Sequence, residues 1–355
     1  MVSTDVFVVG GGPAGLAAAI AARRAGLRVA LADALHPPVD KACGEGLMPD
    51  AVEAARAVGI ALPAADGFPF RGIRFLQDAV STEAVFPSGA GIGLRRTVLH
   101  QALADQAQQA GVDLRWGCSV TSLEAFAARW IIGADGLRSR VRTWAGLDSG
   151  SRKTHRFGFR AHYRIAPWSE YVEVYWAPGF QVYVTPVACD QVCVALISRD
   201  PHFRLEQALP SVPALRDRLA GAELLTAERG APSFSRRLKA VAHGRVALIG
   251  DASGSVDAVT GEGINIAFRQ ARALASALAA GDLGRYEAAH RRLLRCPRRM
   301  GAALLSLDRF PAFRTPALRT FAAYPALFRR LLAIHVGSSG VVHGHDVFDT
   351  PGLAG

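Results

Sequence analysis

Apolar residues along the first part of the chain form runs of strand length. Val6–Val9 and Val29–Ala32 are such runs, and the segment between them is rich in Ala and Leu with the spacing of a helix. A strand, a helix and a strand in this order predict a parallel pair joined by a crossover helix. Further runs follow at Val112–Trp116, Trp130–Ile132 and Val246–Ile249. The pattern predicts an α/β domain whose strands come from distant parts of the chain.

The middle of the chain shows a different periodicity. Short alternating runs between Phe68 and Phe86, and a longer alternation from Arg156 to Ile197, predict antiparallel strands with one buried face. Two helical patterns follow at 205–209 and 212–219, and from Tyr286 to Leu332 the sequence is helical, with Arg recurring between Leu and Phe. A shift of one residue in register would reverse the faces of the strands. The pattern therefore leaves open which of these polar residues face a pocket: Arg160, His162, Tyr175, Tyr183 and Thr185.

Three glycines follow the first strand at the spacing Gly-x-Gly-x-x-Gly, namely Gly10, Gly12 and Gly15. Gly10 permits a tight turn, Gly12 lets the backbone approach a pyrophosphate, and Gly15 lets the helix pack close to the strand. The phosphates would lie at the helix N-terminus, where free N–H groups and the helix dipole favour negative charge. Asp33 ends the second strand, at the position of an acid that accepts ribose hydroxyls. These residues predict a dinucleotide site, open at this point to NAD or FAD.

A loop with reactive side chains follows at Lys41-Ala-Cys43-Gly44-Glu45-Gly46. It comes just after the carboxyl ends of the first parallel strands, where α/β sheets bind their ligands. Cys43 and Glu45 are candidates for proton transfer. Asp50 is expected to cap the helix that runs on to about Val58. A turn with incidental polar residues is the alternative interpretation of this loop.

Two later strand ends carry further acidic turns. Gly133-Ala-Asp135-Gly136 comes directly after Trp130–Ile132, and Gly250-Asp251 comes directly after the strand that ends at Ile249. The helix that runs to about Ala279 opens with Gly261-Glu-Gly263-Ile264-Asn265, and Gly261 and Gly263 at its start offer backbone N–H groups to an anionic or carbonyl edge. No second Gly-x-Gly-x-x-Gly follows a strand, so a single dinucleotide site is predicted.

In order and spacing these motifs resemble those of flavoproteins of the p-hydroxybenzoate hydroxylase and geranylgeranyl reductase group. The resemblance covers most of the chain up to about Ala279 and implies FAD as the cofactor. It implies that Asp33 contacts the adenosine ribose, that Asp251 contacts the ribityl or pyrophosphate region, and that the backbone from Gly261 to Asn265 faces the pyrimidine edge of the flavin. Arg96 resembles the arginine near the flavin and pyrophosphate, and Asp135 belongs to a motif associated with FAD and NAD(P)H. NADPH or NADH is then expected to bind transiently as the reductant.

The implied fold class is α/β, a Rossmann-like FAD-binding domain with an inserted antiparallel-sheet substrate domain and a C-terminal helical segment. We assign residues 1–67, 93–155 and 236–295 to the FAD-binding domain, and residues 68–92 and 156–235 to the substrate domain. Residues 296–337 are assigned to C-terminal helices and residues 338–355 to a tail.

Composition and charge restrict the expected partners. The chain has 355 residues and a formal net charge of +11, but no aromatic and basic module for nucleic acid, so no nucleic acid is expected. Its cysteines lack CxxC spacing and predict neither a disulfide framework nor a metal site.

No signal peptide or membrane span is recognised, which predicts a cytoplasmic protein. The Arg-rich C-terminal helices leave two interpretations open, a peripheral membrane contact or a helical cover over the substrate domain. The oligomeric state is left open.

The favoured hypothesis from the sequence is an FAD monooxygenase, reduced by NAD(P)H, that hydroxylates an apolar phenolic or polyketide-like small molecule. Asn265, which is commoner among the hydroxylases of this group, and the Phe-, Tyr- and Val-rich antiparallel domain support it. The first alternative is a reductase or dehydrogenase of an isoprenoid alkene, because the segments around Cys43 and Gly261 resemble the reductase branch. The second alternative is a non-catalytic FAD or nucleotide-binding module at a membrane. The candidate catalytic residues are Cys43, Glu45 and Tyr183, the last from a strand that resembles the substrate sheet of the reductases.

Overall fold

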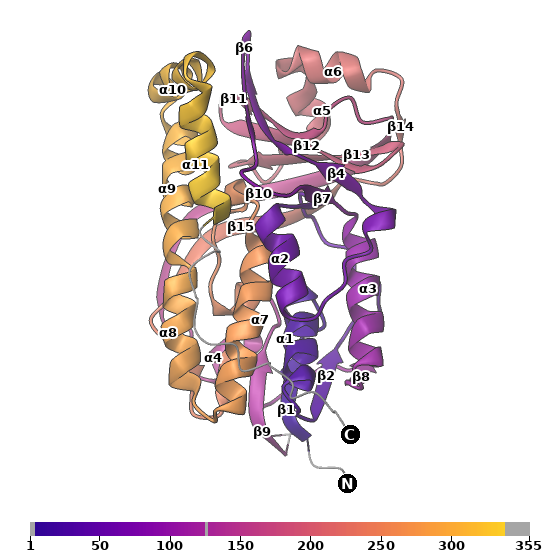
Figure 1. Cartoon of the computed structure of the whole chain (residues 1–355), viewed down its shortest axis with the longest axis vertical. Helices are drawn as coiled ribbons and strands as arrows, with labels where there is room; N and C mark the ends of the chain where they lie inside the picture. The colour runs from indigo at the N-terminus through magenta and orange to yellow at the C-terminus, as the bar shows by residue number, and fades with distance from the viewer. Residues whose placement is uncertain (1–3, 125–126, 338–355) are drawn as a thin grey trace, which may run out of the picture.

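The computed structural model describes residues 4–124 and 127–337, and Figure 1 shows its helices and strands. A six-stranded sheet has the order β16-β17-β9-β1-β2-β8, with parallel pairing throughout except between β16 and β17. Its strands are β1 (Thr4–Val9), β2 (Val29–Asp33), β8 (Asp113–Trp116), β9 (Ala128–Gly133), β16 (Ala242–His243) and β17 (Val246–Leu248). Because β1, β9 and β17 are neighbours, the turns that follow them meet at one edge of the sheet. This edge is where an open α/β sheet binds ligands.

Helices cover this sheet and bury its apolar strands. Helix α1 packs against α3 and α7 as well as against the sheet, and its Ala-rich sequence suits a helix that is surrounded on several sides. Leu16 and Ile20 on α1 join Val8 and Leu31 in the largest apolar core. The helices of this part are α1 (Pro13–Arg24), α2 (Pro49–Ala57), α3 (Arg96–Gln109), α4 (Arg140–Trp144), α7 (Gly263–Ala279) and α8 (Leu283–Leu293). Three short 3₁₀ turns also occur, η1 (Ala64–Asp66), η3 (Gly250–Ser253) and η4 (Ala258–Thr260).

A second, larger sheet lies at the other end of the molecule (Figure 1). Its order is β14-β10-β13-β12-β11-β5-β6, and β15 pairs with β10. The pairing is antiparallel, as expected, except that β5 and β11 run parallel. Its strands are β5 (Gly72–Gln77), β6 (Val80–Val85), β10 (Gly150–Arg164), β11 (Tyr171–Ala177), β12 (Phe180–Ala188), β13 (Gln191–Ser198), β14 (Glu223–Leu224) and β15 (Arg229–Leu238). The predicted fold class, a Rossmann-like domain with an inserted antiparallel sheet and C-terminal helices, is confirmed.

The two faces of this second sheet are covered by different helices. Alternate residues of β11 and β12 show the division, because Tyr175 and Val182 pack on one face while Trp176 and Tyr183 pack on the other. The first face is covered by α5 (Leu205–Ala208), η2 (Leu209–Ser211) and α6 (Pro213–Leu219). The second face meets α9 (Arg295–Arg309), α10 (Pro311–Ala323) and α11 (Pro325–Gly337). The predicted tail, 338–355, lies outside the described residues.

A small third sheet connects the two larger ones. It has the order β3-β7-β4, with β3 (Gly46–Leu47), β4 (Phe68–Phe70) and β7 (Gly91–Gly93). Helix α2 begins directly after β3, and Met48 rather than Asp50 is its N-cap, so the predicted capping role of Asp50 is wrong. Asp50 lies in the first turn of the helix and is buried there. Among the helices of the described residues, none combines the length and the apolar character needed to cross a bilayer.

Candidate functional site

A large cavity of about 1300 Å³ connects the edge of the parallel sheet with the inner face of the second sheet. It is lined by the turns after β1, β9 and β17, by the loop 41–46, by strands of the second sheet and by α9, α10 and α11. Ordinary ligand pockets have volumes of roughly 300 to 1,000 Å³. The cavity therefore has room for an extended dinucleotide and for a second molecule beside it.

The glycines of the first turn have the separate roles that their spacing predicts. Gly10 has a φ of 107°, and a Cβ there would lie 2.5 Å from the carbonyl oxygen of Ala134 on the turn after β9. A Cβ on Gly15 would overlap the carbonyl oxygen of Gly10, so only glycine lets α1 pack this closely. A Cβ on Gly12 would meet no protein atom within 4 Å, because Gly12 faces the cavity. The first turn is thus closed toward the protein and open toward a ligand.

Two side chains hold this turn in place. The Asp33 carboxylate accepts a hydrogen bond from the Gly11 N–H at 2.6 Å and also lines the cavity. The fully buried His100 of α3 lies 2.8 Å from the Gly11 carbonyl oxygen through Nε2, and its Nδ1 accepts from the Val39 N–H. Burial lowers the pKa of His100, which is therefore a neutral imidazole with its proton on Nε2. This role was not predictable from the sequence, since His100 is a buried residue of α3 beside Leu99 and Leu103.

The second acidic turn is built as a helix cap. The Asp135 carboxylate accepts hydrogen bonds from the Ser139 hydroxyl at 2.5 Å and from the Arg140 and Val141 N–H groups. Arg142, in α4, donates to the carbonyl oxygen of Ala252 in η3 at 3.1 Å. The turn after β9 is thereby tied to the turn after β17, although the two residues are 110 positions apart.

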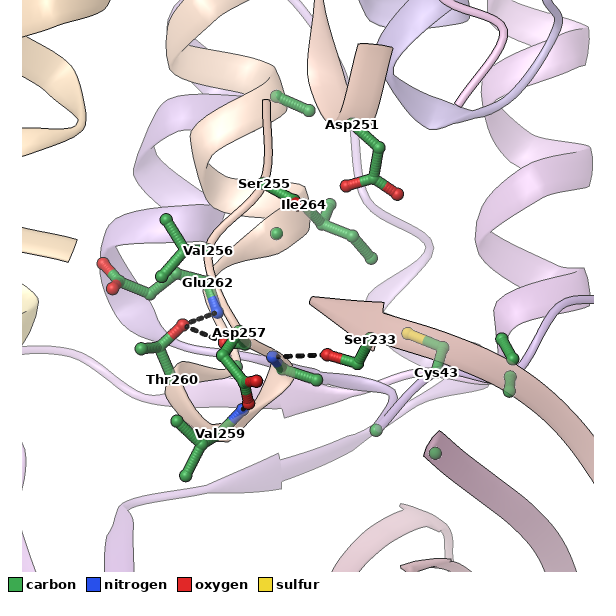
Figure 2. A pocket seen from close by; sticks show the side chains of 18 of the residues that line it. Cys43, Ser233, Asp251, Ser255, Val256, Asp257, Val259, Thr260, Glu262 and Ile264 are labelled. Carbon is green, nitrogen blue, oxygen red and sulfur yellow. Dashed lines mark hydrogen bonds between the residues drawn. The ribbon is translucent and has the colours of Figure 1, made fainter. Parts of the chain in front are cut away.

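The third turn, residues 250–263 after β17, brings its backbone to the cavity from a distant part of the chain. Gly250 and Gly261 have φ values of 61° and 68°, the left-handed conformation that glycine adopts without strain. Gly263 begins the long helix α7 with open space where its side chain would be. Figure 2 shows Asp251 and Ile264 on one side of the pocket and the turn from Val256 to Glu262 below them. Asp251 forms an ion pair with Lys41 at 3.5 Å, which connects this turn to the loop 41–46.

Most of the predicted cofactor residues line this one cavity, namely Gly10, Gly12, Asp33, Arg96, Asp135, Gly250, Asp251, Gly261, Gly263 and Ile264. Gly15 and Asn265 do not line it. Gly15 is a packing residue, as described above, and the buried Asn265 side chain donates to the Asp50 carboxylate of α2. The Arg96 Nε is buried without a hydrogen-bond partner among the described residues. A cradle of open glycines with an unpaired buried guanidinium N–H fits the pyrophosphate and flavin of FAD.

Glu45 is an anchor of the loop 41–46 and is almost completely buried. It has a φ of 59°, which is unusual for a residue other than glycine, and its side chain makes the contacts that hold this conformation. One carboxylate oxygen accepts from the Arg96 N–H at 2.9 Å, and the other lies 2.6 Å from His162 Nε2. Glu45, His162 and Cys193 lie within 4.8 Å of one another, a spacing compatible with a metal ion. The Arg160 guanidinium lies 3.8 Å from Glu45, and its positive charge disfavours a cation there.

Cys43 faces the cavity from the same loop. Figure 2 shows its sulfur directed toward Ser233 and the turn that carries Val259. The Cys43 sulfur accepts a weak hydrogen bond from the Glu45 N–H, with 3.4 Å between the sulfur and the nitrogen. Cys43 is therefore placed between the loop anchor and the free space of the cavity.

The pocket-facing residues of the second sheet are now identified. Arg160, Tyr183 and Thr185 line the cavity, whereas His162 and Tyr175 do not. The Tyr183 hydroxyl donates to the Val259 carbonyl oxygen at 3.4 Å, and burial raises its pKa, so it is a neutral group at physiological pH. Tyr175 instead donates to Glu173 on the opposite face. Tyr183 thus contacts the third turn, while Cys43 and Glu45 lie on the loop 41–46. The catalytic roles of these three residues stay a prediction.

A buried acid beside the third turn was not singled out by the sequence. Glu262 lies between Gly261 and Gly263, lines the cavity, and has no hydrogen-bond partner for either carboxylate oxygen among the described residues. Burial, followed by the nearby Asp50, raises its pKa to about 8, against a smaller opposing effect of Arg269. His335 of α11 lies 3.7 Å from it through Nδ1 and contacts the Thr260 carbonyl oxygen through Nε2. At neutral pH Glu262 is therefore a protonated acid.

Glu262→Gln is expected to stabilise the protein relative to the wild type as the pH rises, with the full effect reached above about pH 8. Below about pH 4.5 the wild-type carboxyl is protonated in the folded and the unfolded chain. Between about pH 4.5 and pH 8 the unfolded chain loses this proton while the folded chain keeps it, so wild-type stability falls relative to the variant. The free energies of unfolding should therefore differ by roughly 5 kcal/mol at pH 9, since one pKa unit corresponds to about 1.4 kcal/mol, and by less than about 1 kcal/mol at pH 5. Denaturant titrations at both pH values measure this, and a difference independent of pH would contradict it.

Comparisons with known proteins agree with this arrangement of motifs. The model of the FAD binding domain family matches residues 3–126 and 124–295. The menaquinone reductase of Mycobacterium tuberculosis is 26% identical over 324 residues, which cover 80% of this chain and 78% of that protein. The digeranylgeranylglycerophospholipid reductase of Methanosarcina acetivorans is 27% identical, covering 73% of this chain and 71% of its own. The chloroplastic geranylgeranyl diphosphate reductase of Oryza sativa is 29% identical, with coverages of 78% and 66%.

Solved structures share the fold over almost the whole chain. The p-nitrophenol 4-monooxygenase of Pseudomonas putida superposes with a TM-score of 0.80 at 18% identity, covering 95% of this chain and 98% of that one. A geranylgeranyl bacteriochlorophyll reductase-like protein of Thermoplasma acidophilum superposes with a TM-score of 0.72 at 20% identity, covering 86% and 90%. At these identities the likeness concerns the fold, which oxygenases and reductases share.

Proposed function

The chain belongs to the FAD binding domain family, and we propose from this premise that it is an FAD-dependent reductase that saturates a carbon–carbon double bond of a long, apolar, isoprenoid-like molecule. Membership of the family makes it a flavin-dependent oxidoreductase. The observation that carries the proposal is the shape and lining of the cavity beyond the cofactor residues. The names of three relatives support the reductase chemistry, and two of them contain a geranylgeranyl group, a long unsaturated hydrocarbon.

The apolar part of the cavity is formed between the second sheet and the C-terminal helices. Phe75, Val174 and Trp176 contribute from the sheet. The helices supply the facing wall, with Leu304 and Leu307 from α9, Phe321 from α10, and Phe328, Leu331 and Leu332 from α11. A compartment with this lining binds hydrocarbon by burying it from water. It offers few groups for the hydroxyls of a small phenol, which favours a long hydrocarbon substrate.

FAD, held by the glycine turns and Arg96, supplies the two-electron chemistry when bound. Saturation of an alkene adds two hydrogens, and one of them must arrive as a proton from an acid beside the double bond. Cys43 lines the cavity where the loop 41–46 faces the third turn, and its thiol carries such a proton. Glu45 fixes the loop through Arg96 and His162, so its role is to position Cys43. NADPH or NADH would reduce the cofactor transiently, since the sequence holds a single Gly-x-Gly-x-x-Gly.

The monooxygenase favoured by the sequence is the alternative function, and the experiment described below distinguishes it from the reductase. It rested in part on Asn265, whose buried side chain donates to Asp50 and does not line the cavity. One observation still suits it, because Tyr183 and Arg160 give the cavity polar groups that could orient a phenol. The two chemistries differ in the atoms they add to the substrate, so product mass separates them.

The proposal predicts that the FAD-loaded protein, given NADPH or NADH without oxygen, converts a geranylgeranyl-chain substrate to a product heavier by two hydrogens. Gly12→Ala, which places a methyl group in the cofactor end of the cavity, serves as the matched inactive control. Mass spectrometry of the product is the measurement. A product that forms only with dioxygen and carries label from ¹⁸O₂ would overturn the reductase in favour of the monooxygenase.

A further inference from the structure

We propose that the outer surface of α9, α10 and α11 docks on an anionic lipid bilayer and that the apolar substrate enters the cavity from that bilayer. The docking part stands on surface composition alone. The entry part rests on the proposed function, because it needs a lipophilic substrate.

Exposed large apolar side chains of the described residues concentrate on these helices. Phe313 and Tyr324 are 69% and 68% exposed, and Leu327 and Ile334 are 42% and 52% exposed. Phe310, at the joint between α9 and α10, is 45% exposed. Elsewhere in the described chain such residues stand apart from one another, at Leu35, Val85 and Leu224. A concentration of exposed aromatic and aliphatic groups on one surface marks an interaction site.

The helices that carry these residues lie together on one flank of the molecule (Figure 1). Figure 1 shows α9, α10 and α11 side by side along one flank, with α10 at the end farthest from the parallel sheet. Phe310 and Tyr324 stand at the two joints of α10, and Phe313 lies in its first turn. Leu327 and Ile334 are seven residues apart on α11, which puts them on one face of that helix. We call these five residues the apolar surface.

The charge around the apolar surface fits an anionic partner. Between Arg291 and Gly337 the sequence contains ten arginines, one aspartate and no glutamate. The single acid, Asp308, is buried and paired with Arg199, so it does not offset the surface charge. Arg319, Arg329 and Arg330 are exposed beside the apolar residues. Aromatic and aliphatic groups among arginines are the composition of proteins that lie on anionic membranes.

The cavity reaches this surface between α9 and α11. Ile334 of α11 is half exposed and also lines the cavity. Arg295 and Arg299 of α9 are exposed and line the cavity as well. On the inner side of the same helices Phe328 and Leu332 line the apolar compartment. A molecule dissolved in hydrocarbon would thus pass from the bilayer into the cavity without crossing water. A partner protein on this surface would instead cover the opening.

Flotation with substrate-free vesicles tests the proposal on the FAD-loaded full chain. We expect wild-type protein to float with vesicles of equal parts phosphatidylcholine and phosphatidylglycerol at low salt, and not with phosphatidylcholine alone. The triple variant Phe313→Ser, Tyr324→Ser and Leu327→Ser should bind about tenfold more weakly or worse. Replacing Arg319, Arg329 and Arg330 by Gln should weaken binding by about fivefold for each charge removed. Leu224→Ser, an exposed apolar residue on β14, should bind as wild type.

Three results would overturn the proposal. They are no binding to anionic vesicles, equal binding by the triple variant, and a dimer in size-exclusion chromatography that the triple variant dissolves, since a second copy would then cover the apolar surface. Bound FAD and the thermal midpoint of each variant establish that it is folded. Because the vesicles contain no substrate, a failed alkene assay leaves this test unaffected. Conversely, the variants should reduce a detergent-dispersed substrate at the wild-type rate if the catalytic proposal holds.

Discussion

Gly12→Ala should purify as a folded protein without its flavin. Gly12 is the N-cap of α1 with φ −69° and ψ 174°, a conformation open to alanine, and its Cβ would meet no protein atom within 4 Å. The methyl group would occupy the space where the backbone approaches the pyrophosphate. We expect FAD affinity to fall roughly 100-fold, as overpacking of about 3 kcal/mol would cause. Flavin absorbance of the purified protein, FAD titration and a thermal melt without added FAD are the measurements.

Gly15→Ala should behave differently, although it lies only three residues further along. Alanine is the better helix former, but its Cβ would overlap the Gly10 carbonyl oxygen, so α1 would have to move away from β1. Stability and FAD binding should fall together, with a loss of about 3 kcal/mol in the free energy of unfolding. Gly337→Ala, where a Cβ has free space and the backbone conformation is ordinary, is the control. If Gly12→Ala melted as early as Gly15→Ala, the assignment of Gly12 to the ligand would fail.

The parts of the site that local sequence controls were predictable. A glycine turn after a strand is specified within a few residues, because φ values such as those of Gly10 and Gly261 exclude most other residues. The meeting of the three turns followed from resemblance in motif order, and the neighbouring places of β1, β9 and β17 in the sheet explain it. The division of the second sheet into two faces also follows from period-two alternation.

The contacts between distant side chains were not predictable in this way. His162 meets Glu45 from 117 residues away, and Asn265 meets Asp50 from 215 residues away. Each pair depends on how two separate elements pack, which no local periodicity encodes. Asp50 and Asn265 show the consequence. The local sequence assigned Asp50 to a helix cap, and the resemblance of its motif grouped Asn265 with the cofactor residues. Glu262 was missed for the same reason, since its burial depends on α2 and α11.

Cys43→Ala should slow product formation by at least about 100-fold, the usual contribution of a general acid, while FAD binding stays intact. The thiol lines the cavity, whereas both oxygens of Glu45 are engaged by the Arg96 N–H and His162. Loss of the thiol therefore removes the proton and one weak contact with the Glu45 N–H, while both side-chain contacts of the loop anchor are kept. Stopped-flow reduction of the flavin by NAD(P)H should proceed at the wild-type rate, and only reoxidation of the reduced flavin by substrate should slow.

The matched control for this prediction is Cys189→Ala, an exposed cysteine in the turn between β12 and β13, which should leave both half-reactions unchanged. Glu45→Gln adds a second comparison, because it keeps the shape of the anchor but weakens its charge-assisted contact with His162. It should reduce turnover less than Cys43→Ala, and the alkylation rate of Cys43 should change as the loop loosens. If Cys43→Ala turned over at the wild-type rate with full FAD content, Cys43 would only fill space, and the proton for alkene reduction would have to come from another group lining the cavity, with Glu262 the first to test.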